Sequence, residues 1–222
     1  ARYGGGVWVR PRKPGMTDMQ YQMRNWYYFT WLSGDFNVEQ FIHQLDRMAW
    51  VMKDQYPARC YSTGGRQART GPDHGHIFDH FSSVFEYPQG VRVFTTTRHQ
   101  RNCSNESQAL VMGTRGTADL KTSTITGENP WQPARRERIS SHQLEQNAFL
   151  AALRAGKVIN NGNYMAKSTM MAIMSRMSAY TGQSLTWQQV INSKEDLSPS
   201  GYTWDSDPPK AEVAVPGVTQ FV

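Results

Sequence analysis

The stretch "GDFNVEQFIHQLDRMAW", residues 34 to 50, decides the fold. Its apolar residues recur every three or four positions, which is the period of a helix that packs one face on a core. With one residue just beyond the stretch, they are Val38, Phe41, Ile42, Leu45, Ala49 and Met52. Asn37 stands where an N-cap belongs, and Pro57 follows soon after the apolar pattern stops. The pattern predicts a single helix from Asn37 to about Asp54.

A second set of side chains lies beside the apolar stripe of this helix. Glu39, His43, Asp46 and Trp50 are spaced i, i+4, i+7 and i+11, so they share one face. A carboxylate next to an imidazole raises its basicity and fixes its tautomer, which suits proton transfer near neutral pH. From spacing alone, an ordinary polar surface is the commoner interpretation. Trp50 argues against bulk water, so we expect this face to be covered or to line a cleft.

Composition and charge limit the class of protein. The chain has 222 residues, of which 38% are hydrophobic and 19% charged, as in a globular protein with a sizeable core. No segment reaches the ~20 apolar residues of a membrane span. The net charge is +6, but the basic residues are scattered and no nucleic-acid-binding motif accompanies the run "ARRER" at 134 to 138. We therefore expect neither a membrane nor a nucleic acid as partner.

Elements expected along the rest of the chain predict an α+β fold with a predominantly antiparallel sheet. Pro88-Gln89-Gly90 joins two strand-like segments and predicts a hairpin. Strands are expected at 1–10, 58–63, 78–87, 91–99, 107–113, 116–122 and 123–127, and helices at 18–24, 140–157, 163–182 and 184–193. The methionines of 163–182 indicate a plastic core. We expect one domain over 1–198 and an extended tail, 199–222, packed on it.

Other polar and aromatic residues are candidates for contacts with a polyhydroxylated ligand. Trp26 and Tyr28 could stack on a sugar ring, with Asn25 nearby, although plain core is an equally good interpretation. Further candidates are Asp35 in the turn before the helix, Asp79 and His80 where a strand begins, and Arg98 where the next strand ends. His74, His76 and His80 share parity in an extended chain, but they lack the ligand spacing of a metal site. Cys60 and Cys103 are too few for a disulfide framework or a zinc site.

Phosphate-binding and nucleophile motifs are missing from the sequence. The tight glycine cluster Gly4-Gly5-Gly6 precedes a strand-like segment, whereas a dinucleotide fingerprint needs a helix there. The sequence also contains no GxxxxGK[ST] loop and no nucleophile elbow. It begins like the middle of a strand, without a visible signal peptide, as if more chain preceded it. On its own residues, the chain has no cradle for a nucleotide phosphate.

The quoted helix resembles the C-terminal domain of the Gfo/Idh/MocA oxidoreductases. That family has a glycine turn and then a helix reading Asp-x-x-x-His-x-x-Asp, with an aromatic residue further on. Here residues 33–35 correspond to the glycine turn, and Glu39 stands where the family has its first Asp. His43, Asp46 and Trp50 correspond to the His, the second Asp and the aromatic residue. The segments "NWYYFTWLSGD", "IFDHFSSVFEYPQG", "STMMAIMSRMSAYTGQSLTW" and "AVPGVTQF" extend the resemblance along the chain.

The resemblance implies a fold, a reaction and partners. The implied fold is an open antiparallel sheet with helices on one face, whose other face commonly makes homo-oligomer contacts. The implied reaction is hydride transfer between NAD or NADP and a hydroxyl-bearing carbon of a sugar, cyclitol or glycoside. An N-terminal Rossmann domain, which also supplies a Glu-Lys-Pro lysine, would hold the cofactor. This chain then corresponds to the substrate-binding half of the enzyme.

The resemblance also implies roles for the residues on the helix. His43 would exchange the proton of the substrate hydroxyl, and Glu39 would orient His43 or contact a sugar hydroxyl. Asp46, the third residue of this catalytic group, would support the helix or His43, a role as much structural as catalytic. A non-catalytic carbohydrate-binding or assembly module is the alternative. The sequence leaves open the substrate, the choice between NAD and NADP, and a cytoplasmic or exported location.

Overall fold

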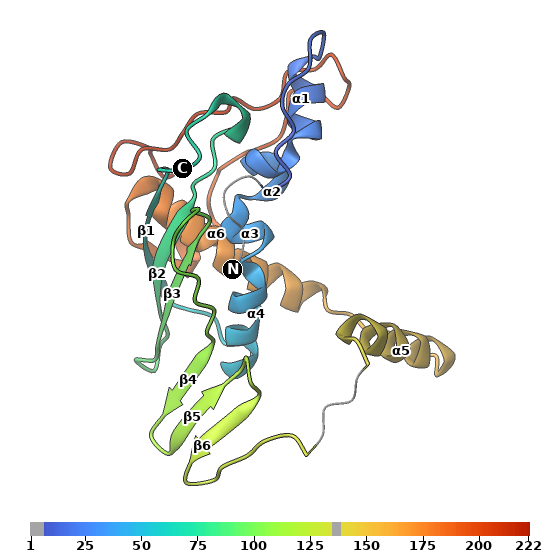
Figure 1. Ribbon diagram of the computed structural model, residues 1–222, viewed down its shortest axis with the longest axis vertical. Helices are drawn as coiled ribbons and strands as arrows, with labels where there is room; N and C mark the ends of the chain where they lie inside the picture. Colours follow the sequence, from blue (N-terminus) through green and yellow to red (C-terminus); the bar gives the residue numbers. More distant parts are fainter. Residues whose placement is uncertain (1–6, 135–138) are drawn as a thin grey trace. The chain divides into compact units, whose positions relative to one another are not determined.

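The computed structural model describes residues 7–134 and 139–222, which form two compact units (Figure 1). The first unit comprises residues 1–105 and 164–222, and the second comprises residues 106–163. Most of the strand expected at 1–10, the glycine cluster and positions 135–138 of the basic run lie outside the described residues. The described remainder of that strand, 7–10, is irregular. The domain boundary expected at 198 stays a prediction.

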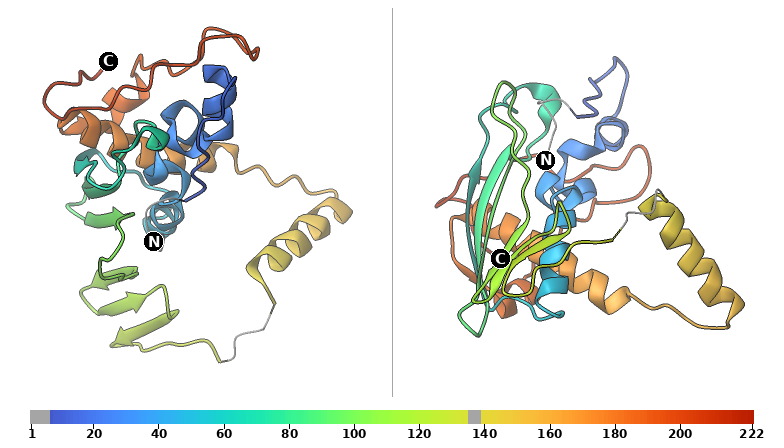
Figure 2. Two further views of the ribbon diagram at one scale, coloured as in Figure 1. Left: turned by 45° about the horizontal axis from the view of Figure 1, so that its top comes forward. Right: turned by 60° about the horizontal axis from the view of Figure 1, so that its bottom comes forward.

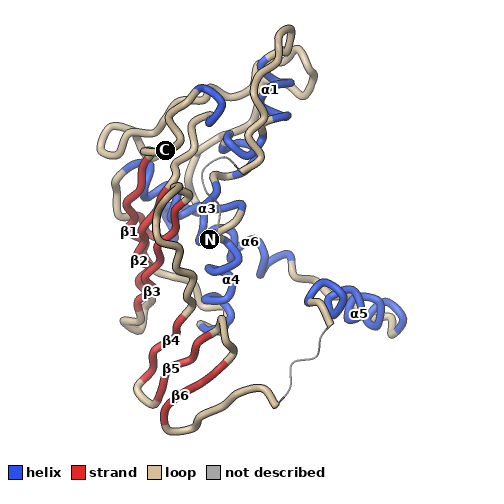
Figure 3. The backbone as a smooth tube through the Cα atoms, viewed as in Figure 1, coloured by secondary structure: helices blue, strands red, loops and turns tan. Residues whose placement is uncertain are grey.

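A four-stranded antiparallel sheet organises the first unit, in the order β3-β2-β1-β7. Its strands are β1 (Arg59–Gly65), β2 (His80–Glu86), β3 (Arg92–Arg98) and β7 (Leu185–Thr186). Figure 3 shows β1, β2 and β3 side by side. The predicted hairpin is confirmed, with Val84 opposite Phe94. Side chains alternate between the faces, so Phe81 and Phe85 are buried whereas Tyr61 and Phe94 are exposed. The sheet therefore has one packed face and one open face.

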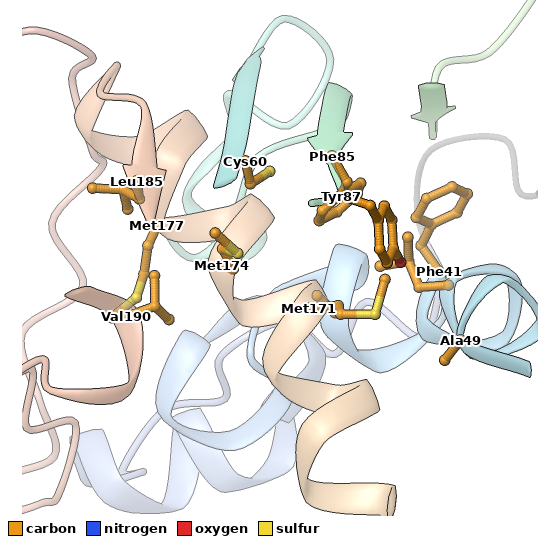
Figure 4. Close-up of a cluster of buried hydrophobic side chains, with 12 residues drawn as sticks. Phe41, Ala49, Cys60, Phe85, Tyr87, Met171, Met174, Met177, Leu185 and Val190 are labelled. Carbon is orange, nitrogen blue, oxygen red and sulfur yellow. The ribbon is translucent and has the colours of Figure 1, made fainter. Parts of the chain in front are cut away.

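The helices of the first unit cover the packed face (Figure 2). They are α1 (Asp18–Arg24), η1 (Trp26–Tyr28), α2 (Thr30–Ser33), α3 (Phe36–Glu39), α4 (Ile42–Val51), η2 (Pro72–His74), α6 (Gly162–Thr181) and α7 (Trp187–Ile191). A methionine-rich core is present, in which Met171, Met174 and Met177 of α6 form one buried cluster with Cys60 and Phe85 of the sheet (Figure 4). Of the predicted stripe, Met174 and Met177 are buried, whereas Met170 and Ile173 are half-buried at the edge of this cluster. The predicted α+β class with an antiparallel sheet is therefore confirmed.

The single helix expected from Asn37 to Asp54 is wrong, because it is broken after Glu39. In a regular α-helix, each amide donates to the carbonyl four residues earlier. At the break, the Phe41 amide donates to the Phe36 carbonyl, five residues earlier, and the Gln44 amide donates to the Phe41 carbonyl, three residues earlier. Asn37 is not the N-cap either. Its amide group donates to the Ala172 carbonyl and to Ser175 of α6, which draws the first turn into the core. These distant contacts on α6 override the local helical period.

The N-terminal helices and the sheet enclose a second core, which is largely aromatic. Its buried rings include Tyr27, Tyr28, Phe36, Phe78, Phe81 and Tyr180. Ring pairs such as Phe78 and Tyr180, with centroids 4.5 Å apart, give this cluster a defined geometry. The cluster contacts the beginning of α3 through Phe36. It therefore positions the turn that leads into the predicted functional helix.

The second unit contains a three-stranded antiparallel sheet and one helix, and much of its apolar surface is exposed. Its elements are β4 (Leu110–Gly113), β5 (Gly116–Asp119), β6 (Thr124–Gly127) and α5 (Ser141–Arg154). None of the described residues of α5 is buried. Across the described parts of both units, no helix combines the length and apolarity that crossing a membrane requires.

The segment 199–222 is extended and is held mainly through backbone hydrogen bonds. The Trp204 carbonyl accepts a hydrogen bond from Thr17, and the Val222 carbonyl accepts one from Ser193. Ala214 packs against the aromatic core and Phe221 against the methionine core. The tail is therefore part of the first unit.

Candidate functional site

The predicted catalytic face joins the end of α3 to the outer side of α4. His43 is exposed, whereas Glu39 is half-buried and one of its carboxylate oxygens has no hydrogen-bond partner among the described residues. Burial raises the pKa of Glu39, and the proximity of His43 partly offsets this rise. No hydrogen bond between Glu39 and His43 is present in the described part of the chain, but the two groups interact electrostatically.

Asp46 and Trp50 occupy the same helix with different surroundings. Asp46 accepts a hydrogen bond from the Tyr164 hydroxyl of α6, so it anchors α4 to α6. Burial and then this carboxylate raise the pKa of Tyr164. The expectation that the Trp50 face is covered is wrong for this chain, because Trp50 is 69% exposed. The indole lies at the surface of the first unit.

Asp35 is a buried anchor and not a surface contact for substrate. Its side chain has no exposed area, and its Oδ2 accepts hydrogen bonds from Tyr180 at 2.6 Å and from the Phe78 amide at 2.9 Å. Burial raises the pKa of Asp35 to about 6, although the Tyr180 hydroxyl and the Arg69 charge lower it in part. The prediction of a direct substrate contact for Asp35 is therefore wrong for this structure.

Arg69, which the sequence analysis did not identify, is fully buried beneath the aromatic core. It donates to the Phe78 carbonyl and to His99 Nδ1, each at 2.6 Å, and its guanidinium lies 4.8 Å from the centre of the Phe36 ring. Because a guanidinium can only donate, Nδ1 of His99 must accept, and the ring is neutral. Burial and Arg69 together lower the pKa of His99 to about 3.

Asp79 is likewise buried, and its carboxylate is saturated by groups of the protein. The successive amides of Gln67, Ala68 and Arg69 donate to its Oδ2 at 2.5 to 3.0 Å, and His80 and Gln100 contact its Oδ1. Burial alone would raise the pKa of Asp79, but these hydrogen bonds outweigh it and hold the pKa at about 2. Asp79 therefore organises the loop after β1 and the segment after β3, and the predicted direct contact with substrate is wrong.

A cavity of about 810 Å³ lies beside the Asp79 carboxylate, between the two segments that it organises. The described residues that line it are Val9, Gln67, Ala68, His74, Gln100, Arg101 and Cys103. Amide, imidazole and guanidinium groups offer donors and acceptors, and the volume lies within the usual range for a small-molecule site. A polyhydroxylated ligand suits this lining. Nothing in local sequence pattern pointed to Gln67, Gln100 or Arg101, because two loops distant in sequence build the cavity.

The remaining predicted ligand contacts fall into two groups. Asn25 and Tyr28 are buried, where Asn25 binds the Asp73 carbonyl at 2.8 Å and Tyr28 the Val7 carbonyl at 2.7 Å, so their predicted contacts with substrate are wrong. Trp26 is half-buried. His80 and Arg98 are opposite each other on β2 and β3 and remain accessible. Only Trp26, His80 and Arg98 of this set stay as predicted contacts.

The histidines at 74, 76 and 80 do not converge on one point. His76 pairs with the Thr30 hydroxyl at 2.6 Å, and burial lowers its pKa to about 4. The His74 ring packs edge-on against Tyr28. Within residues 7–134 and 139–222, no group of three or more His, Cys, Asp or Glu side chains is arranged to hold a metal ion.

Comparison with solved structures gives a consistent fold. An aldose-aldose oxidoreductase from Caulobacter crescentus superposes with a TM-score of 0.59 at 17% identity, over 72% of this chain and 50% of the other. A myo-inositol 2-dehydrogenase from Lactobacillus plantarum superposes with a TM-score of 0.55 at 19% identity, over 69% of this chain and 49% of the other. An oxidoreductase from Thermotoga maritima superposes with a TM-score of 0.58 at 18% identity, over 82% of this chain and 52% of the other.

The chain therefore spans about half the length of the solved structures that it matches. No protein-family model and no curated protein sequence matches it. At these identities the likeness concerns the fold. The fold that the resemblance implied is therefore confirmed.

Proposed function

We propose, from the fold that this chain shares with Gfo/Idh/MocA-type oxidoreductases, that it is the substrate-binding half of such an enzyme. The substrate class is a sugar, cyclitol or glycoside hydroxyl, and the reaction is hydride transfer to or from NAD or NADP. The observation that carries the proposal is the proximity of Glu39 to His43 on the exposed side of a fold known from sugar and cyclitol oxidoreductases.

The dinucleotide would be held on an N-terminal Rossmann domain. None of the described strands leads through a glycine turn into a long helix, which is the arrangement that cradles a pyrophosphate. The described residues of this chain therefore do not fit a dinucleotide site of their own. When bound, the nicotinamide supplies the hydride chemistry, and this chain supplies the groups that bind substrate and move its proton.

In this proposal His43 exchanges the proton of the reacting hydroxyl, and Glu39 orients the imidazole or accepts a substrate hydroxyl. The raised pKa of Glu39 suits a carboxyl that is completed by a ligand. Burial raises the pKa of Tyr27, Arg69 lowers it and Glu39 adds to the rise, so Glu39 and Arg69 both lie near Tyr27.

The test uses the full-length protein, including any domain encoded before residue 1. Aldoses, inositols and glycosides are assayed with NAD and NADP by the absorbance of the reduced nicotinamide. His43→Ala should lower turnover by ~10²-fold or more, because a positioned acid or base contributes that much. The matched control is His142→Ala, since His142 is also an exposed histidine but lies in the second unit. Near-normal turnover of His43→Ala would exclude the catalytic role.

A non-catalytic carbohydrate-binding or assembly module is the second candidate. The exposure of His43 and Trp50 favours it, because neither residue lines the cavity beside Asp79. Titration calorimetry with the same sugars separates the two functions. Sugar binding without turnover in the full-length protein would support the module.

We further propose that the open sheet face joins two copies of the protein. Phe94 and Tyr61 are 72% and 51% exposed on this face, beside an Arg92–Glu86 ion pair of 3.1 Å. Aromatic residues and arginine are enriched at protein–protein interfaces. Phe94→Asp should shift the sedimentation coefficient toward the monomer, whereas Arg24→Asp on α1 should leave it unchanged. A monomeric wild-type protein would contradict this interface.

A further inference from the structure

Asp35 combines three features that are each unfavourable for a purely structural residue. Its carboxylate is completely buried, and its Oδ1 has no hydrogen-bond partner among the described residues. Its backbone lies in the left-handed region, with φ of 76°, although it is not a glycine. It occupies the N-cap position of α3, yet its side chain does not cap the helix.

The charges around Asp35 do not remove the cost of burying it. Arg69 and Arg66 interact with it favourably, and the Tyr180 hydroxyl donates a hydrogen bond to it. Burial outweighs these contributions and holds the pKa of Asp35 well above the ordinary value. Positions at which several local rules fail together are those where function is expected to compensate for lost stability.

The side chain and the backbone of Asp35 connect different parts of the unit. The carboxylate binds Tyr180 near the end of α6 and the Phe78 amide before β2. The carbonyl of the same residue accepts hydrogen bonds from the amides of Val38 and Glu39, each at 2.9 Å. A displacement of the carboxylate would therefore move the short turn that ends in Glu39.

We propose that Asp35 is a positioning residue, which sets the place of Glu39 beside His43 by fastening the first turn of α3 to α6 and to the entrance of β2. This inference rests on the proposed function. The break after Glu39 gives it a physical reason, since a four-residue helix cannot fix its own orientation. Contacts outside the helix must do so, and the Asp35 carboxylate makes two of them.

The experiment compares Asp35→Asn and Tyr180→Phe in the full-length protein with Tyr87→Phe. Tyr87 is a buried tyrosine of the methionine core whose hydroxyl has no partner among the described residues, so its substitution is a matched control. We expect kcat to fall roughly 10-fold in both test variants, because misplacement of a reacting group by a fraction of an ångström lowers the rate. The KM for sugar should change far less, and the melting temperature of Asp35→Asn should stay level or rise.

A merely structural role gives a different result. It would lower the melting temperature and the folded fraction, while kcat per folded molecule stayed normal. Amide hydrogen exchange adds a direct readout, because the Val38 and Glu39 amides should exchange faster in both test variants while the β2 amides stay protected. Unchanged exchange at these two amides would overturn the proposal, and so would a normal kcat in Asp35→Asn.

The outcomes separate this inference from the proposed function. If His43→Ala keeps its turnover, the proposed function fails, and the exchange measurement alone decides whether Asp35 positions Glu39. If His43→Ala is inactive and Asp35→Asn turns over normally, only this inference fails. Should Asp35→Asn not fold, Tyr180→Phe decides, because it removes one hydroxyl and keeps the ring that packs on Phe78.

Discussion

Two polar regions of the first unit differ in nearly every physical respect. The helical face carries Glu39 and His43 near solvent, whereas the buried polar cluster, defined here as Asp35, Arg69, Asp79 and His99, has no exposed side-chain area. The helical face has few internal hydrogen bonds, and the buried cluster is linked to backbone groups of distant loops. Groups that react with a ligand must keep free hydrogen-bonding capacity, whereas buried groups that shape a site need partners within the protein, which Asp79 has in full and Asp35 only in part.

The two regions also divide the work of the proposed site. The cluster holds the loops that form the cavity and the turn that leads into α3, so its residues act through geometry. The helical face holds the groups that would touch a substrate. Substitutions of Arg69 or Asp79 should therefore reduce stability, whereas substitution of the incompletely satisfied Asp35 should lower activity without loss of stability near neutral pH. Substitutions on the helical face should reduce activity alone.

The largest effect on stability is expected for Arg69→Met. It leaves the Phe78 carbonyl and His99 without their donor and removes the positive charge near Asp35. Breaking such a buried network costs about 3–5 kcal/mol in the free energy of unfolding. Urea denaturation measures this loss, with Arg47→Met on the exposed side of α4 as the control, for which we expect a change within about 0.5 kcal/mol. An equal loss of unfolding free energy in Arg69→Met and Arg47→Met would contradict the structural role of the buried polar cluster.

The second effect is a dependence on pH that Asp35 imposes. Its folded-state pKa of about 6 lies above the ordinary value of 3.8, so the folded state binds the proton more tightly. Its contribution to stability is therefore greatest at acidic pH and falls as the pH rises through about 6, by about 2 kcal/mol between roughly pH 4 and 7. The difference in unfolding free energy between wild type and Asp35→Asn should follow this curve. A pH-independent difference would show that Asp35 is not the titrating group.

Asp79 should show the opposite sign in the same cluster. Its folded-state pKa of about 2 is below the ordinary value of 3.8, so its contribution is present above pH 3.8 and is lost as the pH falls through about 2. Asp79→Asn should cost about 2 kcal/mol at neutral pH and much less in strong acid. Chemical denaturation at the two pH values checks this. A loss of the same size at both would assign the effect to packing and not to charge.

The smallest effect on stability is expected for His43→Ala. Because His43 is exposed, its replacement should change the free energy of unfolding by no more than about 0.5 kcal/mol. The same variant is expected to lose ~10²-fold or more in turnover. A large loss of stability together with a small loss of turnover would place His43 with the structural residues.

Much of the fold could be predicted from local patterns. The hairpin of β2 and β3 follows from alternating side chains and a Pro-Gln-Gly turn, and the α6 core follows from methionines at helical spacing. The face of Glu39, His43 and Asp46 was also visible as a spacing. These features depend on residues that are neighbours in sequence, and local period and turn chemistry determine them.

Other features could not be predicted in this way. The break after Glu39 depends on Asn37 binding α6, which lies more than a hundred residues further along the chain. Asn25, Tyr28 and Asp35 were predicted to contact a ligand because polar and aromatic residues suit a sugar, yet each is buried. Residue type alone does not tell an internal hydrogen bond from a bond to a ligand.

The sequence by itself determined the α+β class, the alternation of β1 to β3, the core face of α6 and the shared spacing of Glu39 and His43. The tertiary structure alone decided which polar residues are buried, where the long helix breaks and which segments line the open cavity beside Asp79. The reason is physical. Periodicity sets the direction of a side chain relative to its own element, whereas burial and the partners of a carboxylate depend on segments that only folding brings together.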